Sequence, residues 1–206
     1  MGRARFITLE GGEGVGKTTN LEFVERHLAL RGVRFVRTRE PGGTRLGEAV
    51  RDWLLGFEAV APEAELLLLF AARAQHLDTV IRPALRSGQW VICDRFTDAS
   101  YAYQGGGRGL DPQPIAFLER WIQDGLEPDL TLLLDAPVEV GLERARGRGR
   151  TDRFEAEALP FFARVRDAYL ERAARFPNRI KRIDAARPLP EVRAEIARYL
   201  DALLDP

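Results

Sequence analysis

The stretch Leu9–Asn20, LEGGEGVGKTTN, places four glycines, one lysine and two threonines between two regular elements. The apolar residues Phe6–Leu9 before it predict a buried strand, and the pattern that begins at Lys17 predicts a helix. Glycine at this density disfavours a helix and leaves a strand with little to pack. The stretch is therefore expected to form a loop whose function depends on its backbone more than on its side chains.

Residues 11–18, GGEGVGKT, match the phosphate-binding pattern G-x-x-x-x-G-K-S/T, after a strand and at the start of a helix. Glycines allow positive φ values, so several backbone N–H groups can converge on one phosphate, and the helix N-terminus adds its unpaired N–H groups. Lys17 supplies a full charge to the β- and γ-phosphates, and the Thr18 hydroxyl offers a ligand to Mg²⁺. The predicted triphosphate site consists of Gly11, Gly12, Glu13, Gly14, Val15, Gly16, Lys17, Thr18 and Thr19.

Short β-rich runs alternate with longer helical patterns along the chain. Several runs are almost continuously apolar, which is typical of parallel strands covered on both faces. The predicted strands are Ala4–Leu9, Arg34–Arg39, Trp90–Asp94, Leu130–Asp135 and Arg179–Ile183. The predicted helices are Lys17–Leu30, Arg45–Leu55, Pro62–Arg86, Pro112–Asp124, Val138–Arg144, Glu155–Ala174 and Leu189–Leu204. This alternation predicts a doubly wound α/β architecture in a single domain, residues 1–206.

The composition narrows the choice of partners and compartment. Lysine plus arginine (31) balance aspartate plus glutamate (31), so bulk charge supports neither a nucleic-acid nor a membrane partner. The longest apolar run, Leu66–Ala72, is far shorter than a membrane span, and the N-terminus lacks a signal-peptide pattern. The single cysteine, Cys93, excludes an intrachain disulfide and fits a cytoplasmic protein. His27 and His76 are isolated, which disfavours a metal site built on histidine or cysteine.

A second motif follows the third predicted strand, which ends in VICDR. Asp94 lies at the carboxyl end of this strand, where it can hold Mg²⁺ or its waters beside the phosphate loop. Arg95, next to it, can bind a second anion. A phosphate loop alone is compatible with GTPases, motor ATPases and small-molecule kinases. The chain contains no guanine-reading N-K-x-D tetrapeptide, which argues against a GTPase-like switch.

The order of these motifs resembles the thymidylate kinase family of nucleoside monophosphate kinases. The stretches that carry the resemblance cover essentially the whole chain and read LEGGEGVGKTT, TREPGGT, FAARAQH, CDRFTDASYAYQGGGRGL, LLLDAP, RARGRGRTDRFE and IDAARPLPEV. The resemblance implies a three-layer P-loop nucleoside monophosphate kinase fold, a five-stranded parallel sheet with helices on both faces, and a homodimer. It also implies conversion of dTMP to dTDP with ATP and Mg²⁺. A kinase for another nucleoside monophosphate is the alternative.

The resemblance implies roles for residues around the reacting phosphates. Glu13 and Glu40 are expected near the dTMP sugar and those phosphates. Arg51 and Arg95 are expected to bind the dTMP phosphate. A catalytically inactive nucleotide-binding module is disfavoured, because Lys17, Thr18, Asp94 and Arg95 are all present together with the arginines of the segment at about residues 144–154.

The resemblance also implies an acceptor-base site. Arg73 is expected to bind the thymine edge, with Ser100 and Gln104 adding polar contacts. Tyr103 is expected to lie under the deoxyribose, where it leaves no room for a 2′-hydroxyl.

Phe70 and Arg73 are three residues apart, so they share a helix face and can combine a stacking ring with a fork of donors. The family usually places its stacking phenylalanine four residues before this arginine, where this chain has Leu69. Phe70 is taken as the stacking residue, with Leu69 and a core position for Phe70 left open.

An arginine-rich segment at about residues 144–154 is expected to form a lid over the triphosphate, because glycines allow it to move and arginines bind phosphate. A nucleic-acid patch is disfavoured by the lack of interleaved aromatic residues. Some thymidylate kinases carry an arginine at the position of Gly14, and this chain does not. Arg148 and Arg153, with Arg150 as a further candidate, are therefore expected to stabilise the transferred charge.

Two further arginines are assigned to the ATP site. Arg144 is expected to pack on adenine, helped by the loop AARP at residues 185–188, which contains Arg187. The glycine-rich stretch at residues 105–109 is expected to be mobile, like the arginine-rich one.

Overall fold

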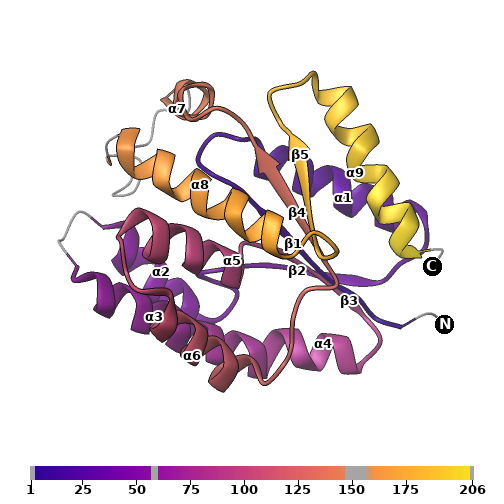
Figure 1. The fold of residues 1–206 in the computed structure, drawn as a ribbon. Coiled ribbons are helices and arrows are strands. Elements are labelled where there is room, and N and C mark those ends of the chain that lie inside the picture. The colour runs from indigo at the N-terminus through magenta and orange to yellow at the C-terminus, as the bar shows by residue number, and fades with distance from the viewer. Residues whose placement is uncertain (1–2, 57–59, 147–156, 158, 205–206) are drawn as a thin grey trace.

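The computed structural model describes residues 3–56, 60–146, 157 and 159–204, and the structural statements below concern these ranges. Five parallel strands form one sheet in the order β2-β3-β1-β4-β5 (Figure 1). The strands are β1 (Phe6–Glu10), β2 (Phe35–Arg39), β3 (Trp90–Asp94), β4 (Leu130–Asp135) and β5 (Ile180–Asp184). The predicted strands are confirmed, with ends that differ by at most two residues.

Helices connect the strands and cover both faces of the sheet (Figure 1). The α-helices are α1 (Lys17–Leu30), α2 (Arg45–Leu55), α3 (Pro62–His76), α4 (Arg82–Arg86), α5 (Thr97–Ser100), α6 (Pro112–Gln123), α7 (Val138–Arg146), α8 (Leu159–Arg175) and α9 (Leu189–Leu204). Two π-helical segments, η1 (Leu77–Ile81) and η2 (Tyr101–Gly107), continue α3 and α5. The helix predicted at Pro62–Arg86 is thus an unbroken run of α3, η1 and α4. None of the described helices is long and apolar enough to cross a membrane.

Alternating side chains of the strands build a separate core on each face. Ile7 and Leu9 of β1 pack against α1 and α9, while Phe6 packs on the opposite face against η1 and α4. Leu133 of β4 also points to that opposite face, where it packs against η2 and α8. Two apolar faces on the same strands explain why these strands read as continuous apolar runs. The predicted five-stranded parallel sheet with helices on both faces is confirmed.

The order of the strands also determines where the ligand-binding site lies. β1 lies between β3 and β4, and the chain crosses to β2 and β3 on one side and to β4 and β5 on the other. Ligands of such sheets bind in the crevice beyond the carboxyl ends of the strands, at the point where the order reverses. Glu10 at the end of β1, the phosphate loop after it, and Asp94 at the end of β3 all lie at this edge.

The glycine-rich stretch at residues 105–109 differs from the expectation of a mobile loop. Its first three residues complete η2, in a helical run from Thr97 that was not predicted. A β-carbon on Gly106 would lie 2.7 Å from the Ala168 β-carbon, and Arg164 Nη2 donates to the Gly107 carbonyl at 2.7 Å. Glycine here allows close approach of η2 to α8. Sequence alone does not distinguish that use of glycine from flexibility.

Candidate active site

The phosphate loop has the backbone that its glycines predicted. Gly11, Gly14 and Gly16 have φ values of 140°, 68° and 88°, and α1 begins at Lys17 directly after Gly16. No side chain caps the first turn of α1. The N–H groups at the start of α1 are therefore not occupied by a capping side chain, as phosphate binding requires.

Lys17 places its ammonium inside the loop. Its Nζ donates to the carbonyl oxygens of Gly11 at 3.2 Å and Gly12 at 2.9 Å. Burial, followed by repulsion from the Arg95 guanidinium, lowers the pKa of Lys17 from its usual value to about 8. An incoming anion would oppose both effects, so the lysine is arranged to gain charge stabilisation from a phosphate.

A cavity of about 270 Å³ opens in front of this loop and is called here the cationic cavity. Lys17, Arg51 and Arg95 converge on it from α1, α2 and the turn after β3. Burial, followed by repulsion from Arg39 and Arg95, lowers the pKa of Arg51. Three cations that line one cavity, with Arg95 repelling the other two, favour a polyanionic ligand. The cavity is lined by Glu13, Gly14, Val15, Gly16, Lys17, Thr18, Pro41, Arg51, Leu54, Leu55, Leu69, Asp94, Arg95 and Tyr103.

Arg95 is held in an unusual backbone conformation. Its φ is 68°, which is uncommon for a residue with a β-carbon and frequent at functional turns. Its Nη2 donates to the Tyr103 hydroxyl at 2.8 Å, and Glu13 Oε2 lies 3.7 Å from the same nitrogen. The strained turn therefore directs the guanidinium between the phosphate loop and η2.

Asp94 and Thr18 have the properties of Mg²⁺ ligands. Both line the cationic cavity, and Asp94 Oδ1 is buried without a hydrogen-bond partner in the described structure. The described residues contain no group of three or more His, Cys, Asp or Glu side chains that could hold a metal ion. Mg²⁺ in nucleotide enzymes needs only one or two protein ligands, because phosphates and waters complete its shell. The residues present fit this ion.

A second cavity of about 50 Å³, called here the inner cavity, adjoins the first. Arg73 is fixed at its wall by two bonds: its Nε donates to Glu40 Oε2 at 2.7 Å and its Nη2 to Ser100 Oγ at 3.0 Å. Its third nitrogen, Nη1, is buried and has no partner in the described structure. The lining residues are Glu40, Pro41, Leu69, Arg73, Arg95, Phe96, Ala99, Ser100, Tyr103 and Gln104.

Gln104 in the inner cavity is oriented by a buried acid that was not predicted. Gln104 Nε2 donates to Oε1 of Glu65, a side chain with no exposed surface. Because a carboxylate only accepts, this contact turns the amide nitrogen toward Glu65 and leaves Gln104 Oε1 as an acceptor. The wall of the inner cavity thus combines a spare donor on Arg73 with an acceptor on Gln104.

Leu69, and not Phe70, lines both cavities. Phe70 is 1% exposed and packs in a core cluster with Leu66 and Ile115. Its ring lies 4.4 Å from the Arg73 guanidinium carbon, so it supports the arginine from the core side. The position of Phe70 therefore does not fit the stacking role expected from the sequence.

The structure places the remaining site residues at the edge of these cavities or outside the described ranges. Arg144 donates from Nη1 to the Ala185 carbonyl at 3.0 Å, which joins α7 to the loop after β5. Arg187 is exposed, and its guanidinium binds Glu191 of α9 at 2.7 Å. Thr19 is exposed on α1. Arg148, Arg150 and Arg153 lie outside the described residues.

Glu10 is a buried acid directly before the phosphate loop that sequence reasoning missed. It has no exposed surface, and its carboxylate accepts from the Phe96 N–H at 2.7 Å and from the Tyr169 hydroxyl at 2.7 Å. Burial, followed by the nearby Asp98 carboxylate, raises the pKa of Glu10 to about 8. The only signal in the sequence was an acid at the end of an apolar strand, directly before the loop.

Comparison with known proteins agrees with this geometry. The family model described as thymidylate kinase matches residues 9–196. A thymidylate kinase of Methylococcus capsulatus is 63% identical over 200 residues, covering 97% of this chain and 96% of the relative. A thymidylate kinase of Pseudomonas entomophila is 59% identical over 201 residues, covering 97% and 94%. The crystal structure of a thymidylate kinase from Ehrlichia chaffeensis superposes with a TM-score of 0.79 at 34% identity, covering 97% of this chain and 99% of that one. The chain belongs to the thymidylate kinase family.

Proposed function

We propose that the protein transfers the γ-phosphoryl group of ATP to dTMP and so produces dTDP. One observation carries this proposal: a cationic cavity in front of a phosphate loop adjoins a small cavity with directed donors and acceptors. The two share Pro41, Leu69, Arg95 and Tyr103 in their walls. A nucleoside monophosphate therefore fits with its base in the inner cavity and its phosphate facing the triphosphate.

ATP binds in this proposal at the phosphate loop. The positive φ values of the loop glycines and the uncapped start of α1 support this assignment. Lys17 leaves its two carbonyl partners and binds the β- and γ-phosphates. The contact between Arg144 and the Ala185 carbonyl supports an adenine site at the edge formed by α7 and the loop after β5.

The dTMP phosphate is assigned to Arg51 and Arg95. Both line the cationic cavity together with Lys17. The second pKa of a phosphate monoester is about 6, so at neutral pH the attacking oxygen is largely deprotonated and no general base is needed. Transfer is then direct and in-line, and catalysis rests on positioning and on neutralising charge.

Mg²⁺ is assigned to Asp94 and Thr18. The unpartnered, buried Asp94 Oδ1 supports this. The ion supplies positive charge to the phosphate oxygens during transfer. Arg148 and Arg153 keep the role proposed for the lid, namely binding the charge that develops on the transferred group.

The base preference follows from the polarity of the inner cavity. Thymine presents an acceptor at O4 next to a donor at N3–H, while cytosine presents a donor next to an acceptor. Arg73 Nη1 is a spare donor and Gln104 Oε1 is an acceptor, so the pair complements thymine. Cytosine would leave buried polar groups unpaired, which costs affinity.

The expected contact of Glu40 with the acceptor changes in this proposal. Its oxygens bind Arg73 and His76, at 2.7 Å and 2.9 Å. We therefore assign Glu40 to holding Arg73. Glu13 keeps its proposed place near the acceptor, supported by its carboxylate, which reaches from the phosphate loop to within 3.7 Å of the Arg95 guanidinium. Tyr103 keeps its proposed role under the deoxyribose, which is supported by its position in the walls of both cavities.

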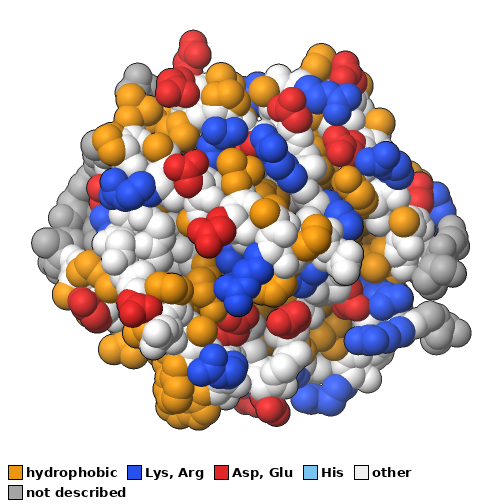
Figure 2. Space-filling view, in the orientation of Figure 1, with side chains coloured by type: hydrophobic (Ala, Val, Ile, Leu, Met, Phe, Trp, Pro, Cys, Tyr) orange, Lys and Arg blue, Asp and Glu red, His pale blue; other side chains and the backbone are white. Residues whose placement is uncertain are grey.

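The protein is also proposed to form a homodimer. Leu67 on α3 and Phe117 and Trp121 on α6 are large apolar side chains that are more than half exposed, and α3 packs against α6. Figure 2 shows hydrophobic side chains gathered at the lower left, over the region of α6. Burial of such a surface in a second copy would remove it from water. Light scattering on the parent and on Trp121→Arg tests this, since a dimer through this face would become a monomer.

A substrate panel tests the proposed reaction. ADP release is measured with ATP, Mg²⁺ and, in turn, dTMP, dUMP, dCMP, dGMP and AMP. We expect dTMP to have the highest kcat/KM and dCMP to be a poor substrate. A clear preference for any other monophosphate would favour the alternative, a P-loop kinase with a different acceptor.

A further inference from the structure

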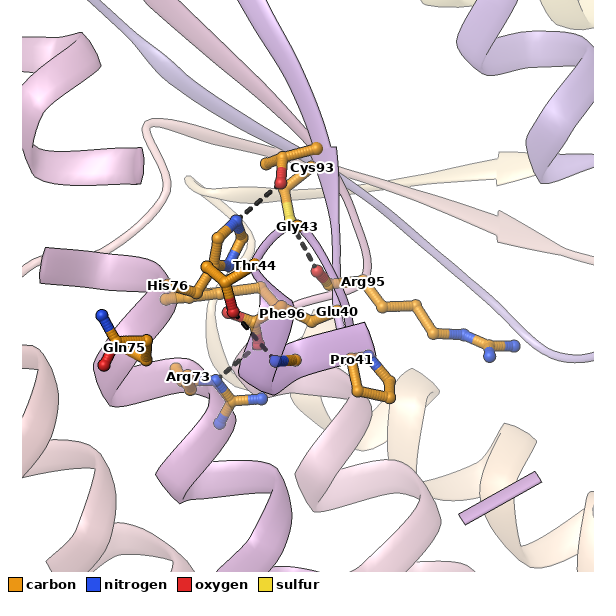
Figure 3. Close-up of polar contacts among 12 residues, drawn as sticks. Glu40, Pro41, Gly43, Thr44, Arg73, Gln75, His76, Cys93, Arg95 and Phe96 are labelled. Carbon is orange, nitrogen blue, oxygen red and sulfur yellow. Dashed lines mark hydrogen bonds and ion pairs between the residues drawn. The ribbon is translucent and has the colours of Figure 1, made fainter. Parts of the chain in front are cut away.

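Arg73 is the donor assigned to the acceptor base, and its orientation depends on a chain of buried hydrogen bonds. Glu40 Oε2 accepts from Arg73 Nε at 2.7 Å, and Glu40 Oε1 contacts His76 Nδ1 at 2.9 Å. His76 Nε2 in turn contacts Thr38 Oγ1 at 2.6 Å. Figure 3 shows Arg73 and His76 projecting from the same helix toward Glu40, while Arg95 points away from the group.

The chain of contacts matches one tautomer of the His76 imidazole. The Glu40 carboxylate only accepts, so Nδ1 carries the hydrogen and donates to it. Nε2 is then the acceptor for the Thr38 hydroxyl. Both oxygens of Glu40 and both ring nitrogens of His76 are therefore engaged, and the carboxylate is held from two sides.

The far end of this chain is anchored in the sheet. Thr38 is a residue of β2 that pairs with Cys93 of β3. Gly43, with a φ of 72°, lies against the contact between Thr38 and His76, because a β-carbon there would be 2.8 Å from His76 Nε2. His76 has no exposed surface, and it does not line the inner cavity. On the side of the inner cavity it contacts Glu40, which in turn binds Arg73.

We propose that His76 is a positioning residue for recognition of the acceptor base. Together with Thr38 it fixes the Glu40 carboxylate, which fixes the Arg73 fork so that Nη1 meets the base. This inference rests on the proposed function, in which Arg73 binds the thymine edge. A side chain locked by a second layer of hydrogen bonds keeps its geometry when the ligand binds, and that preorganisation raises affinity and selectivity.

Steady-state kinetics of four variants test this role. His76→Leu removes both contacts, His76→Asn keeps a donor near the place of Nδ1, and Thr38→Val removes the far anchor at nearly constant volume. We expect the KM for dTMP to rise roughly 10-fold or more in His76→Leu, the scale of a lost hydrogen bond to a charged group, and less in the other two. The KM for ATP should stay within about two-fold of the parent in all three. His27→Asn, at the surface contact of His27 with Asp201, is the matched control and should leave both constants unchanged.

A double-mutant cycle separates positioning from general stabilisation. If His76 acts through Arg73, His76→Leu should add little to the dTMP KM in an Arg73→Gln background. The inference would be overturned if the effects of His76→Leu and Arg73→Gln on the dTMP KM were fully additive. It would also be overturned if His76→Leu raised the KM for ATP as much as the KM for dTMP. If His76→Leu does not fold, Thr38→Val and His76→Asn decide the question, because in both the KM for dTMP should rise relative to the KM for ATP.

The two levels of the proposal can fail separately. If Arg73→Gln leaves the dTMP KM unchanged, the base contact in the proposed function is wrong, and the role of His76 is wrong with it. If Arg73→Gln raises the dTMP KM while Thr38→Val and both His76 variants keep the parental value, only the positioning role is overturned.

Discussion

Gly14 of the phosphate loop packs directly on Gly141 of α7, so a β-carbon on Gly14 would overlap with the Gly141 carbonyl. A β-carbon on Gly141 would in turn overlap with the Glu13 carbonyl. No side chain fits at position 14 while α7 lies there. The absence of an arginine at position 14 is therefore built into the packing of the loop against α7.

Gly14→Ala is expected to destabilise the fold by roughly 2 kcal/mol or more, because it combines an unfavourable positive φ with overpacking. The measurement is chemical denaturation followed by circular dichroism. Gly12→Ala is the matched control, since a β-carbon on Gly12 would meet no atom within 4 Å. Equal loss of stability in both variants would contradict the packing argument.

ATP binding is expected to draw a proton onto Lys17 in mildly alkaline solution. The pKa of Lys17 is about 8 in the ligand-free protein, because burial and Arg95 disfavour the charged form. A bound triphosphate raises that pKa, so binding near pH 8.5 takes up a proton, and the uptake fades toward pH 6.5, where the lysine is already charged. Calorimetry in buffers of different ionisation enthalpy measures the number of protons taken up when ATP binds. Lys17→Met should show no uptake of this kind; if it matches the parent, another group is responsible.

Glu10 is expected to make the fold less stable as the pH rises from about 5 to 8. Its pKa is about 8 in the folded protein against 4.5 as the ordinary value, so the folded state binds the extra proton in this window. The stabilisation is complete below the unfolded pKa and is lost as the pH passes the folded pKa. Glu10→Gln should therefore gain stability relative to the parent as the pH rises. Thermal unfolding at several pH values shows this, with the exposed Glu22→Gln as a charge control. A constant difference across the range would contradict it.

Substitutions at Leu69 and Phe70 are expected to have different effects, the first on dTMP binding and the second on the stability of the fold. Leu69→Ala should raise the KM for dTMP with a small loss of stability, because Leu69 lines both cavities. Phe70→Ala should cost about 3–5 kcal/mol of unfolding free energy, as large-to-small changes in a core do. Substrate titrations and denaturation curves on both variants test this. The reverse pattern would return the stacking role to Phe70.

Arg153→Ala is expected to lower kcat by orders of magnitude with little change in dTMP affinity, because the arginine is proposed to bind charge that develops only in the transition state. Steady-state kinetics measure kcat, and equilibrium binding measures the affinity for dTMP. Arg198→Ala, on the exposed face of α9, is the matched control. A turnover within a few-fold of the parent would remove Arg153 from the proposed mechanism.

Local rules account for what the sequence determined. The positive φ values of the loop glycines, the start of α1 at Lys17 and the ends of the strands depend on residues within a few positions of one another. The parallel direction of the strands follows from their alternation with helices, because each crossover helix returns the chain to the same edge of the sheet. This is why the phosphate loop and the doubly wound fold could be predicted from the chain alone.

Contacts between distant residues account for what only the tertiary structure decided. Arg73 meets Glu40 across 33 residues, and Gln104 meets Glu65 across 39. The rotation of α3 against α6 places Phe70 in the core and Leu69 at the cavity, although both are apolar neighbours in sequence. A sequence pattern states which side chains are present, but burial, pKa and the spare donor of Arg73 are set by the segments that fold against them.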